Sequence, residues 1–387
     1  MSDNIITIIN FGMLKSEFLA GVQGIKPYLQ RNALNPQIFS WRLVNDMIAR
    51  HDSASANFKL MKNGIIPKQQ YMESYLEVGT IKHRVHKPSM YDLLRNGASL
   101  VLNKIENTYE VEDIRNQIAQ YCGRQTVISG YAAFGDDMSF GNHYDTHDVF
   151  AIQLIGSKRW TIYPPTLVNP NHTQSSVGRE SECTAIPYMS VVLEAGDLFY
   201  LPRGWWHEVC PTGSETFHLA IGTYPAHASD YLRWVSERVI NTYSSARASL
   251  TNCQVDKGGI RRLSEFMACE LLNSQNYQLF NDEFSANERL HSNYAVEIFG
   301  NPSARIMPCY YRYRINANRA EFSESTYAII CGKKVLFDSP NAMVLQTISD
   351  SPGISSTGIA SQLPHLEESE ILEMLFVMAD QDLIQIF

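Results

Sequence analysis

The sequence predicts an α+β protein built around a double-stranded β-helix, or jelly roll, with helical additions. Between Thr126 and Tyr224, short runs rich in β-branched and aromatic residues are separated by Gly, Pro, Asn and Ser. Closely spaced short strands of this kind are typical of a jelly roll or a barrel. After Pro225 the pattern becomes helical, and from about residue 294 strand-like and helical segments follow one another. These two changes of pattern predict additions that follow the β-domain.

Length and pattern together divide the chain into three parts. A chain of 387 residues exceeds one ordinary core and suggests two or three domains. We expect a β-domain with an N-terminal extension at 1–227, a helical region at 228–293 and a winged-helix-like domain at 294–387. Within the extension, Ile114 to Tyr121 predicts an amphipathic helix and Ala98 to Leu102 a compact apolar strand.

Composition limits the partners and the compartment that we expect. The net charge of −8 and the pI near 5.8 disfavour a broad electrostatic contact with nucleic-acid phosphates, but they suit a basic protein or peptide partner. The seven cysteines are widely spaced and form no C-x-x-C pair, which predicts a reducing compartment. No signal-peptide pattern and no apolar run of about 18 residues is visible, so we expect a cytoplasmic protein without a membrane segment.

The first candidate metal ligands lie in the segment NHYDTHDVF. His143 and Asp145 are two residues apart, so on an extended strand their side chains leave the same face and can reach one ion. About one His-x-Asp or His-x-Glu pair is expected by chance in such a composition. A second pair does occur at His365 and Glu367. The first pair therefore needs independent support.

That support comes from the segment GDLFYLPRGWWHEV. Its Gly196, Pro202, Gly204 and His207 fit the cupin spacing G-x5-P-x-G-x2-H. Pro202 and Gly204 predict a tight turn between two barrel strands, and this turn would direct His207 inward. Two histidines and one aspartate form the facial triad that leaves three positions of an octahedral iron(II) open. The sequence therefore predicts His143, Asp145 and His207 as ligands of iron(II).

Lys158 is a candidate anion-binding residue. It follows an apparent hairpin turn at Gly156-Ser157 and alternates with Trp160 and Ile162, which are expected to face the barrel interior. A lysine on such a face needs an anionic partner. Local sequence alone favours a solvent-exposed lysine, but the joint occurrence with the three ligand candidates favours the inward orientation.

The ligand pattern departs from that of ordinary cupins, which carry His-x-His followed by a glutamate. This chain has Asp145 in place of the second histidine, and only Val149 and Phe150 where the glutamate would fall. The pattern resembles the JmjC oxygenases, in which a basic residue fifteen positions after the first ligand holds the distal carboxylate of 2-oxoglutarate. Lys158 stands at that position relative to His143.

Among these enzymes the chain resembles the ribosomal oxygenases, which hydroxylate residues of ribosomal proteins. The matching segments are HYDTHDVFAIQLIGSKRWTIYPP, GDLFYLPRGWWHEV and FHLAIGTYP. The family's order of catalytic barrel, helical dimerisation region and winged helix covers nearly the whole chain. The resemblance implies a homodimeric Fe(II)- and 2-oxoglutarate-dependent dioxygenase that uses O2 to hydroxylate an arginine or histidine of a ribosomal protein.

His218 is a further candidate in the segment FHLAIGTYP. It shares one strand face with Ala220 and Gly222, so it is expected either near the iron or the cosubstrate, or as a hydrogen-bonded core histidine.

His147 and Asp148, which follow the ligand candidate Asp145, suggest a dinuclear hydrolase, but the H-x-H-x-D-H arrangement of such enzymes is absent. We expect His147 at the barrel rim.

Three other functions remain open at the level of sequence. A JmjC-type N-demethylase would use the same iron chemistry. A divalent-metal hydrolase would use the same three ligands, but it leaves Lys158 without a role. A non-catalytic cupin-like regulator would bind nucleic acid through the winged helix, but Val335 to Phe387 contains no Lys or Arg and eight acidic residues. We therefore expect no direct contact with nucleic acid.

Overall fold

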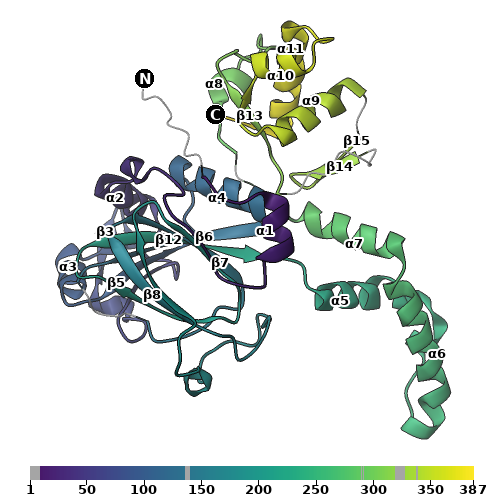
Figure 1. Cartoon of the computed structure of the whole chain (residues 1–387), viewed down its shortest axis with the longest axis horizontal. Helices are drawn as coiled ribbons and strands as arrows, with labels where there is room; N and C mark the ends of the chain where they lie inside the picture. The colour runs from purple at the N-terminus through teal and green to yellow at the C-terminus, as the bar shows by residue number, and fades with distance from the viewer. Residues whose placement is uncertain (1–8, 136–139, 289, 291, 319–326, 337–338) are drawn as a thin grey trace. The chain divides into compact units, whose positions relative to one another are not determined.

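The computed structural model describes residues 9–135, 140–288, 290, 292–318, 327–336 and 339–387. The chain forms two compact units, Met1–Tyr224 and Pro225–Phe387 (Figure 1). Within the described residues, no helix combines the length and the apolar character needed to cross a membrane. The finer division into three domains remains a prediction.

Two antiparallel sheets form the core of the first unit, which confirms the predicted jelly-roll-type fold. Trp160 of the smaller sheet packs against Phe199 of the larger one, with ring centroids 5.7 Å apart, inside an apolar cluster between the sheets. In spatial order, the larger sheet consists of β1 (Tyr28–Gln30), β10 (Leu198–Leu201), β7 (Asp148–Ile155), β12 (Thr216–Tyr224), β6 (Gln125–Ala133), β5 (Ser99–Asn103) and β2 (Phe58–Met61), and the smaller one of β11 (Trp206–Pro211), β8 (Ser157–Tyr163) and β9 (Met189–Glu194).

The interior strand β7 explains why the two sheets stack. Apart from Asp148 and Gln153, its sequence DVFAIQLI is apolar on both faces, and only its last residue is partly exposed. Ala151 contributes to the cluster between the sheets, whereas Phe150 and Ile152 belong to the main core on the opposite face. A strand that is covered on both sides loses the apolar-polar alternation of a half-exposed strand.

The N-terminal extension covers the larger sheet (Figure 1). In helix α4 (Tyr109–Cys122), the predicted apolar side chains Ile114, Ile118 and Tyr121 are buried, and the predicted strand Ala98 to Leu102 is confirmed as β5. The helix ends at Gly123, whose φ of 64° is readily adopted only by glycine. The other elements are α1 (Lys15–Gly21), α2 (Trp41–Arg50), α3 (Lys87–Arg95) and the exposed hairpin of β3 (Met72–Glu77) and β4 (Thr80–Val85).

The predicted hairpin at Gly156-Ser157 is wrong. Strand β7 pairs with β10 and β12, whereas β8 pairs with β9 and β11, so the chain passes from one sheet to the other at this point. Gly156 has a φ of +63°, and a Cβ atom there would lie 2.3 Å from the carbonyl oxygen of Glu215. The corner therefore requires glycine for both conformation and space.

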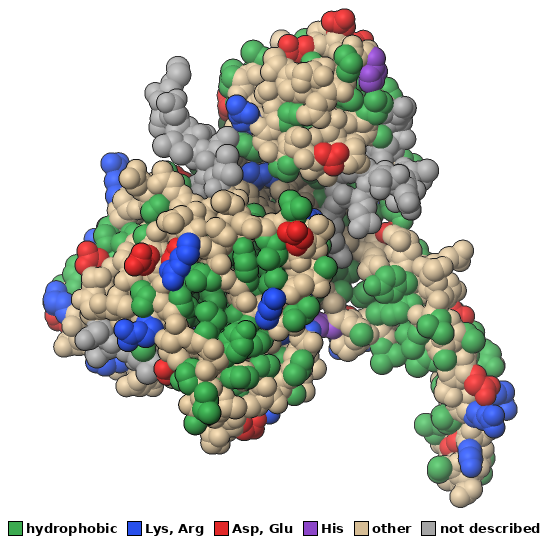
Figure 2. Space-filling view, in the orientation of Figure 1, with side chains coloured by type: hydrophobic (Ala, Val, Ile, Leu, Met, Phe, Trp, Pro, Cys, Tyr) green, Lys and Arg blue, Asp and Glu red, His purple; other side chains and the backbone are tan. Residues whose placement is uncertain are grey.

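The second unit contains a helical segment followed by a small α+β fold. The helical segment comprises α5 (Ala228–Arg238), α6 (Cys253–Leu271) and α7 (Ser274–Ala286). Tyr231, Val235 and Phe280 are buried between them, but no residue of α6 is buried. Figure 2 shows hydrophobic side chains gathered over α5 and α7.

The C-terminal part combines three-stranded and two-stranded sheets with helices. Ile348, Ile359 and Leu375 are fully buried in its core. The elements are α8 (Val296–Phe299), β13 (Arg312–Ile315), β14 (Tyr327–Ile330), β15 (Lys333–Leu336), α9 (Ser339–Asp350), β16 (Ile354–Ser355), α10 (Ser356–Gln362), α11 (Glu368–Asp380) and β17 (Ile384–Ile386). The winged-helix assignment of this part remains a prediction.

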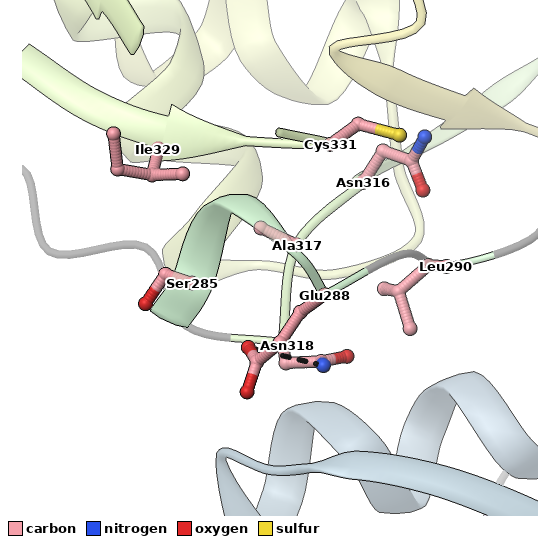
Figure 3. A pocket seen from close by; sticks show the side chains of 8 residues that line it. All are labelled: Ser285, Glu288, Leu290, Asn316, Ala317, Asn318, Ile329 and Cys331. Carbon is pink, nitrogen blue, oxygen red and sulfur yellow. Dashed lines mark hydrogen bonds between the residues drawn. The ribbon is translucent and has the colours of Figure 1, made fainter. Parts of the chain in front are cut away.

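A small pocket lies within the second unit (Figure 3). Its empty volume of about 240 Å³ is below the usual range for small-molecule sites. Asn318 Nδ2 donates a hydrogen bond of 3.4 Å to the Glu288 carboxylate at its wall. The lining residues are Ser285, Glu288, Leu290, Asn316, Ala317, Asn318, Ile329 and Cys331.

Candidate metal centre

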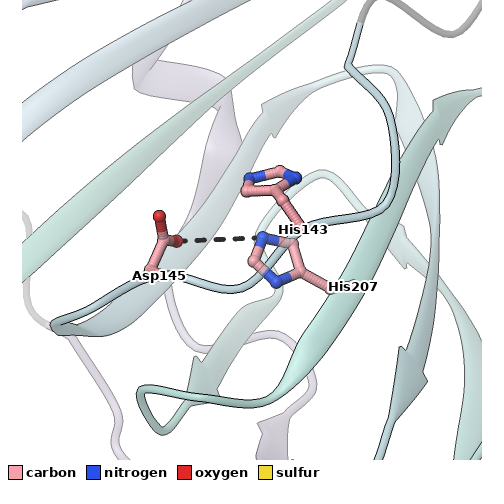
Figure 4. A group of neighbouring side chains, drawn as sticks. All are labelled: His143, Asp145 and His207. Atoms are coloured by element: carbon pink, nitrogen blue, oxygen red, sulfur yellow. Dashed lines mark ion pairs between the residues drawn. The ribbon is translucent and has the colours of Figure 1, made fainter. Parts of the chain in front are cut away.

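The structure brings the three predicted ligands together. One potential ligand atom from each of His143, Asp145 and His207 lies within 4.8 Å of the other two (Figure 4). His207 belongs to β11, whereas the other two residues lie in the segment that leads into β7. Among the described residues this is the sole group of three or more such side chains, so His365 and Glu367 form no comparable site.

Backbone pairing explains how ligands distant in sequence meet. His143 and His207 form an isolated antiparallel bridge, in which each N–H donates to the other's carbonyl at 3.1 and 2.7 Å. The predicted turn of Pro202 and Gly204 is confirmed: Gly204 has a φ of +85°, and its N–H donates to the Asp145 carbonyl at 3.0 Å. Glycine is required here because a Cβ atom would lie 2.5 Å from the Leu167 carbonyl oxygen.

Hydrogen bonds set both histidines for metal binding through Nε2. His207 Nδ1 lies 3.2 Å from the Trp205 carbonyl, and His143 Nδ1 lies 2.9 Å from the Gly141 carbonyl. Since a carbonyl only accepts, each Nδ1 carries a proton, which leaves Nε2 as the nitrogen available to a metal ion. Burial, followed by the proximity of His143, lowers the pKa of His207 to about 4, so its imidazole is neutral at pH 7.

Asp145 supplies the negative charge of the site. Burial raises the pKa of its carboxyl group, but His147, His207 and His143 lower it by more, so the net shift is downward. The carboxylate is therefore ionised at neutral pH and lies 3.8 Å from His207 Nε2. Two imidazoles and one carboxylate suit a divalent first-row metal ion.

Asp148, a candidate for a dinuclear site, lies outside this group. Its carboxylate pairs with Arg124, accepts a 2.8 Å hydrogen bond from the Tyr200 hydroxyl and accepts another from the Arg203 N–H at 3.0 Å. It is buried and fully occupied in joining three segments of the barrel. The arrangement supports a site for one metal ion.

His147 also lies apart from the ligand group. Its ring stacks on Tyr224, with centroids 5.2 Å apart, and a Cβ atom at Gly222 would lie 2.6 Å from it. Partial exposure of His147 agrees with the expected position at the barrel rim.

Lys158 points into the same cavity as the ligands. The predicted alternation along β8 is confirmed, because Lys158, Trp160 and Ile162 are buried and Arg159 is exposed. Lys158 is 4% exposed, and burial lowers its pKa to about 7. Among the described residues its Nζ has one hydrogen-bond partner, His218 Nδ1 at 2.9 Å, and no carboxylate forms an ion pair with it. A buried ammonium group without a carboxylate partner is costly unless an anion binds beside it.

His218 lies beside Lys158 in this cavity. Burial, followed by the nearby Lys158, lowers its pKa well below the usual value. The neutral Nδ1 can therefore accept a hydrogen bond from the Lys158 ammonium group. Its ring stacks on Tyr131 at 4.9 Å and meets Trp160 edge-on at 5.8 Å.

The cavity has an empty volume of about 730 Å³, including its open mouth, which is in the range of small-molecule sites. Sequence reasoning missed Tyr131 and Phe140. The pairing of β6 with β12 places Tyr131 opposite His218, and knowledge of this pairing would have identified Tyr131 as a cavity residue. The lining residues are Ser99, Tyr131, Phe140, His143, Asp145, Val149, Lys158, Trp160, Leu201, His207, Val209, Pro211, His218 and Ala220.

Comparison with known proteins places this site in a family. Residues 101–231 match the family model of the JmjC domain, and they contain all five candidate site residues. The chain thus contains a region of the JmjC-domain type. It is similar to the ribosomal oxygenases, as the sequence motifs predicted.

Two curated relatives illustrate the relationship. The chain is 29% identical to ribosomal oxygenase 1 of Danio rerio over 37% of this chain and 28% of that protein. It is 27% identical to the bifunctional lysine-specific demethylase and histidyl-hydroxylase NO66 of Aedes aegypti over 54% of this chain and 33% of that protein. The matches thus span about a third or less of the length of these relatives.

Solved structures show the same fold. The Escherichia coli ribosomal oxygenase YcfD has a TM-score of 0.56 with this chain and is 16% identical to it, over 98% of this chain and 99% of that chain. Structures of YcfD were also determined with cobalt and 2-oxoglutarate and with cobalt and succinic acid.

Proposed function

We propose that this chain is an Fe(II)- and 2-oxoglutarate-dependent oxygenase that hydroxylates a protein side chain. The observation that carries the proposal is the buried Lys158 ammonium group, which shares a cavity with the ligand set of His143, Asp145 and His207 but has no carboxylate partner among the described residues. A hydrolase would need the ligands but not this lysine. The complex of YcfD with cobalt and 2-oxoglutarate supports the same assignment.

The donor set fits the proposed iron. His143 and His207 would hold Fe(II) through Nε2, and Asp145 through its carboxylate. When bound, iron, 2-oxoglutarate and O2 supply the oxidation of an unactivated C–H bond, with succinate and carbon dioxide as by-products. The carboxylate offsets one of the two positive charges of the ion, and the neutral imidazoles add none.

The other side chains would bind and orient the cosubstrate. Lys158 would pair with the distal carboxylate of 2-oxoglutarate, and His218 would hold the ammonium group in place from behind. Trp160 and Leu201 are buried in the cavity wall and exclude water around this ion pair. Low water content strengthens the pairing.

A basic protein is the proposed substrate. The names of the relatives point to ribosomal proteins and to histidine, and the net charge of −8 favours a basic partner. We propose an arginine or histidine side chain of a ribosomal protein as the target. Mass spectrometry of cellular proteins with and without the active enzyme tests this. Gain of one oxygen atom on such a residue supports hydroxylation, and loss of a methyl group would instead indicate N-demethylation.

The affinity for 2-oxoglutarate should depend on pH through Lys158. Its pKa of about 7 means that the free ammonium group loses its proton as pH rises through 7. Because only the protonated form attracts the carboxylate, the affinity should fall by up to about tenfold per pH unit above this value. Isothermal titration calorimetry between pH 6.5 and 9 measures the effect. Lys158→Arg, which stays charged, should flatten the profile, and an equal slope in both proteins would contradict the assignment.

We also propose that the chain is a homodimer through residues 228–293. Helix α6 buries none of its residues, and exposed apolar side chains include Leu232, Val255 and Ile260. Apolar surface of this kind on a helical appendage favours contact with a second copy.

Val255→Asp combined with Ile260→Asp should convert the dimer to a monomer, since each aspartate places a charge in the apolar contact. Light scattering at micromolar concentration measures the mass of both proteins. Lys257→Asp, between the two positions, serves as a control for added charge. A wild-type monomer would contradict the proposal.

A further inference from the structure

The segment that carries His143 and Asp145 has little backbone support of its own. It lies outside the named strands of the structure. Its described backbone hydrogen bonds to the rest of the barrel are the bridge to His207 and the bond from Gly204 N–H to the Asp145 carbonyl. Two ligands on such a segment need side-chain contacts to keep a fixed separation from the third.

The side chain between these two ligands points away from the metal centre and is buried. Tyr144 is 3% exposed, and Trp206, the residue before the ligand His207, is fully buried. Their rings meet edge to face, with centroids 4.8 Å apart and an interplanar angle of 84°. Tyr144 and Trp206 each stand next to a ligand in the sequence and face away from the metal centre. Their contact therefore joins the two ligand-bearing segments directly.

Residues 164–188, which connect β8 to β9, cover this aromatic pair. Trp206 Nε1 donates to Thr166 Oγ1 at 2.9 Å. Ser176 is buried, and its Oγ donates to the Tyr144 carbonyl at 3.0 Å. The connection is thus tied to both ligand-bearing segments.

The Tyr144 hydroxyl makes several hydrogen bonds to residues 164–188. It donates to the Gln174 carbonyl at 3.0 Å and to the Ser175 carbonyl at 3.3 Å, and it accepts from Arg179 Nη1 at 3.0 Å. Arg179 is itself held by two hydrogen bonds to the Glu182 carboxylate, at 2.9 and 2.8 Å. A charge-assisted bidentate pair fixes the guanidinium plane and so fixes the position of the hydroxyl.

We propose that residues 164–188 form a strap that holds the two ligand-bearing segments at a metal-binding separation, with Tyr144 as a positioning residue for the metal ion. The strap acts from outside the barrel and touches neither metal nor cosubstrate. The inference rests on the proposed function, because it concerns the same three ligands. Outer contacts of this kind commonly change metal affinity by about 10- to 100-fold when removed.

Titration of the full-length protein with Co(II), followed by its visible absorption, tests the strap. Tyr144→Phe removes the bonds to Gln174, Ser175 and Arg179 but keeps the ring against Trp206. We expect the Co(II) Kd to rise roughly 10- to 100-fold, with an altered Co(II) spectrum. Arg179→Gln should act in the same direction, and the two changes together should be less than additive because they break one contact.

Val177→Thr is the matched control, because Val177 lies in the strap but is 83% exposed. It should leave both the Kd and the spectrum unchanged. If Tyr144→Phe fails to fold, the Co(II) titration of Arg179→Gln tests the inference in its place. This variant should fold, because the Arg179 side chain is 34% exposed and lies at the surface. Unchanged Kd and spectrum in the folded variants, with only a lower Tm of the metal-free protein, would overturn the inference and leave the proposed function intact. Wild-type protein that binds no Co(II) would overturn both.

Discussion

Replacement of any one of His143, Asp145 and His207 by alanine should abolish iron-dependent conversion of 2-oxoglutarate to succinate. Each residue supplies one of three protein ligands, and two ligands hold a divalent ion much less tightly. Since loss of an outer contact alone costs about 10- to 100-fold in metal affinity, loss of a ligand should exceed about 100-fold. Succinate formation by the purified protein at saturating 2-oxoglutarate measures the effect.

The matched control for these variants is His365→Ala. His365 belongs to the His-x-Glu pair of the sequence, which forms no metal-binding group in the part of the chain that the structure describes. Its variant should retain wild-type turnover. Wild-type turnover in one of the three ligand variants would remove that residue from the ligand set.

Lys158→Ala should raise the 2-oxoglutarate requirement while leaving iron binding nearly intact. The variant removes the buried ammonium group that, among the described lining residues, is the one Lys or Arg of the cavity, and it leaves the cosubstrate carboxylate unpaired. Truncation of one partner of a buried charge pair costs about 2–5 kcal/mol, which corresponds to a rise in Kd of about 30-fold or more. Anaerobic calorimetry with 2-oxoglutarate in the presence of Fe(II) measures the Kd directly.

Arg159→Ala provides the comparison for Lys158→Ala. Arg159 is the next residue on β8, but it is exposed on the opposite face of the strand. Its loss removes a positive charge of the same size without touching the cavity, so the Kd should stay within about twofold at 0.15 M salt. Equal effects of the two substitutions would indicate long-range electrostatics in place of a direct contact.

Much of this site could be predicted from sequence because the relevant patterns are local. The turn at Pro202 and Gly204 depends on residues close to it, and its direction fixes that of His207. The alternation along β8 likewise places Lys158 and Trp160 on one face and Arg159 on the other. Such patterns specify which side of a strand a residue occupies.

Pairing between distant strands could not be predicted in the same way. The glycine corner at Gly156 has the local pattern of a hairpin, and only the partners of β7 and β8 show that they belong to different sheets. The same limit applies to Tyr131, which becomes part of the cavity because β6 pairs with β12 opposite His218. The contact of His218 with Lys158 joins β12 to the other sheet, so strand alternation alone left the role of His218 open.

The contacts that residues 164–188 make with the ligand-bearing segments also could not be predicted from sequence patterns. Residues 164–188 contain no strand and no α-helix among the described elements, and their side chains show no periodicity that would relate them to Tyr144. Their contacts arise only when the strands before and after them are in place. Irregular connections of this length are often functional.

A structure of crystals soaked with Fe(II) and 2-oxoglutarate without oxygen would show directly which residues hold the iron and the cosubstrate. We expect iron bound by His143 Nε2, the Asp145 carboxylate and His207 Nε2. We also expect 2-oxoglutarate in the same cavity, with its distal carboxylate within hydrogen-bond distance of Lys158 Nζ. Iron bound elsewhere, or a cosubstrate carboxylate held by other residues while Lys158 still contacts only His218, would contradict this expectation.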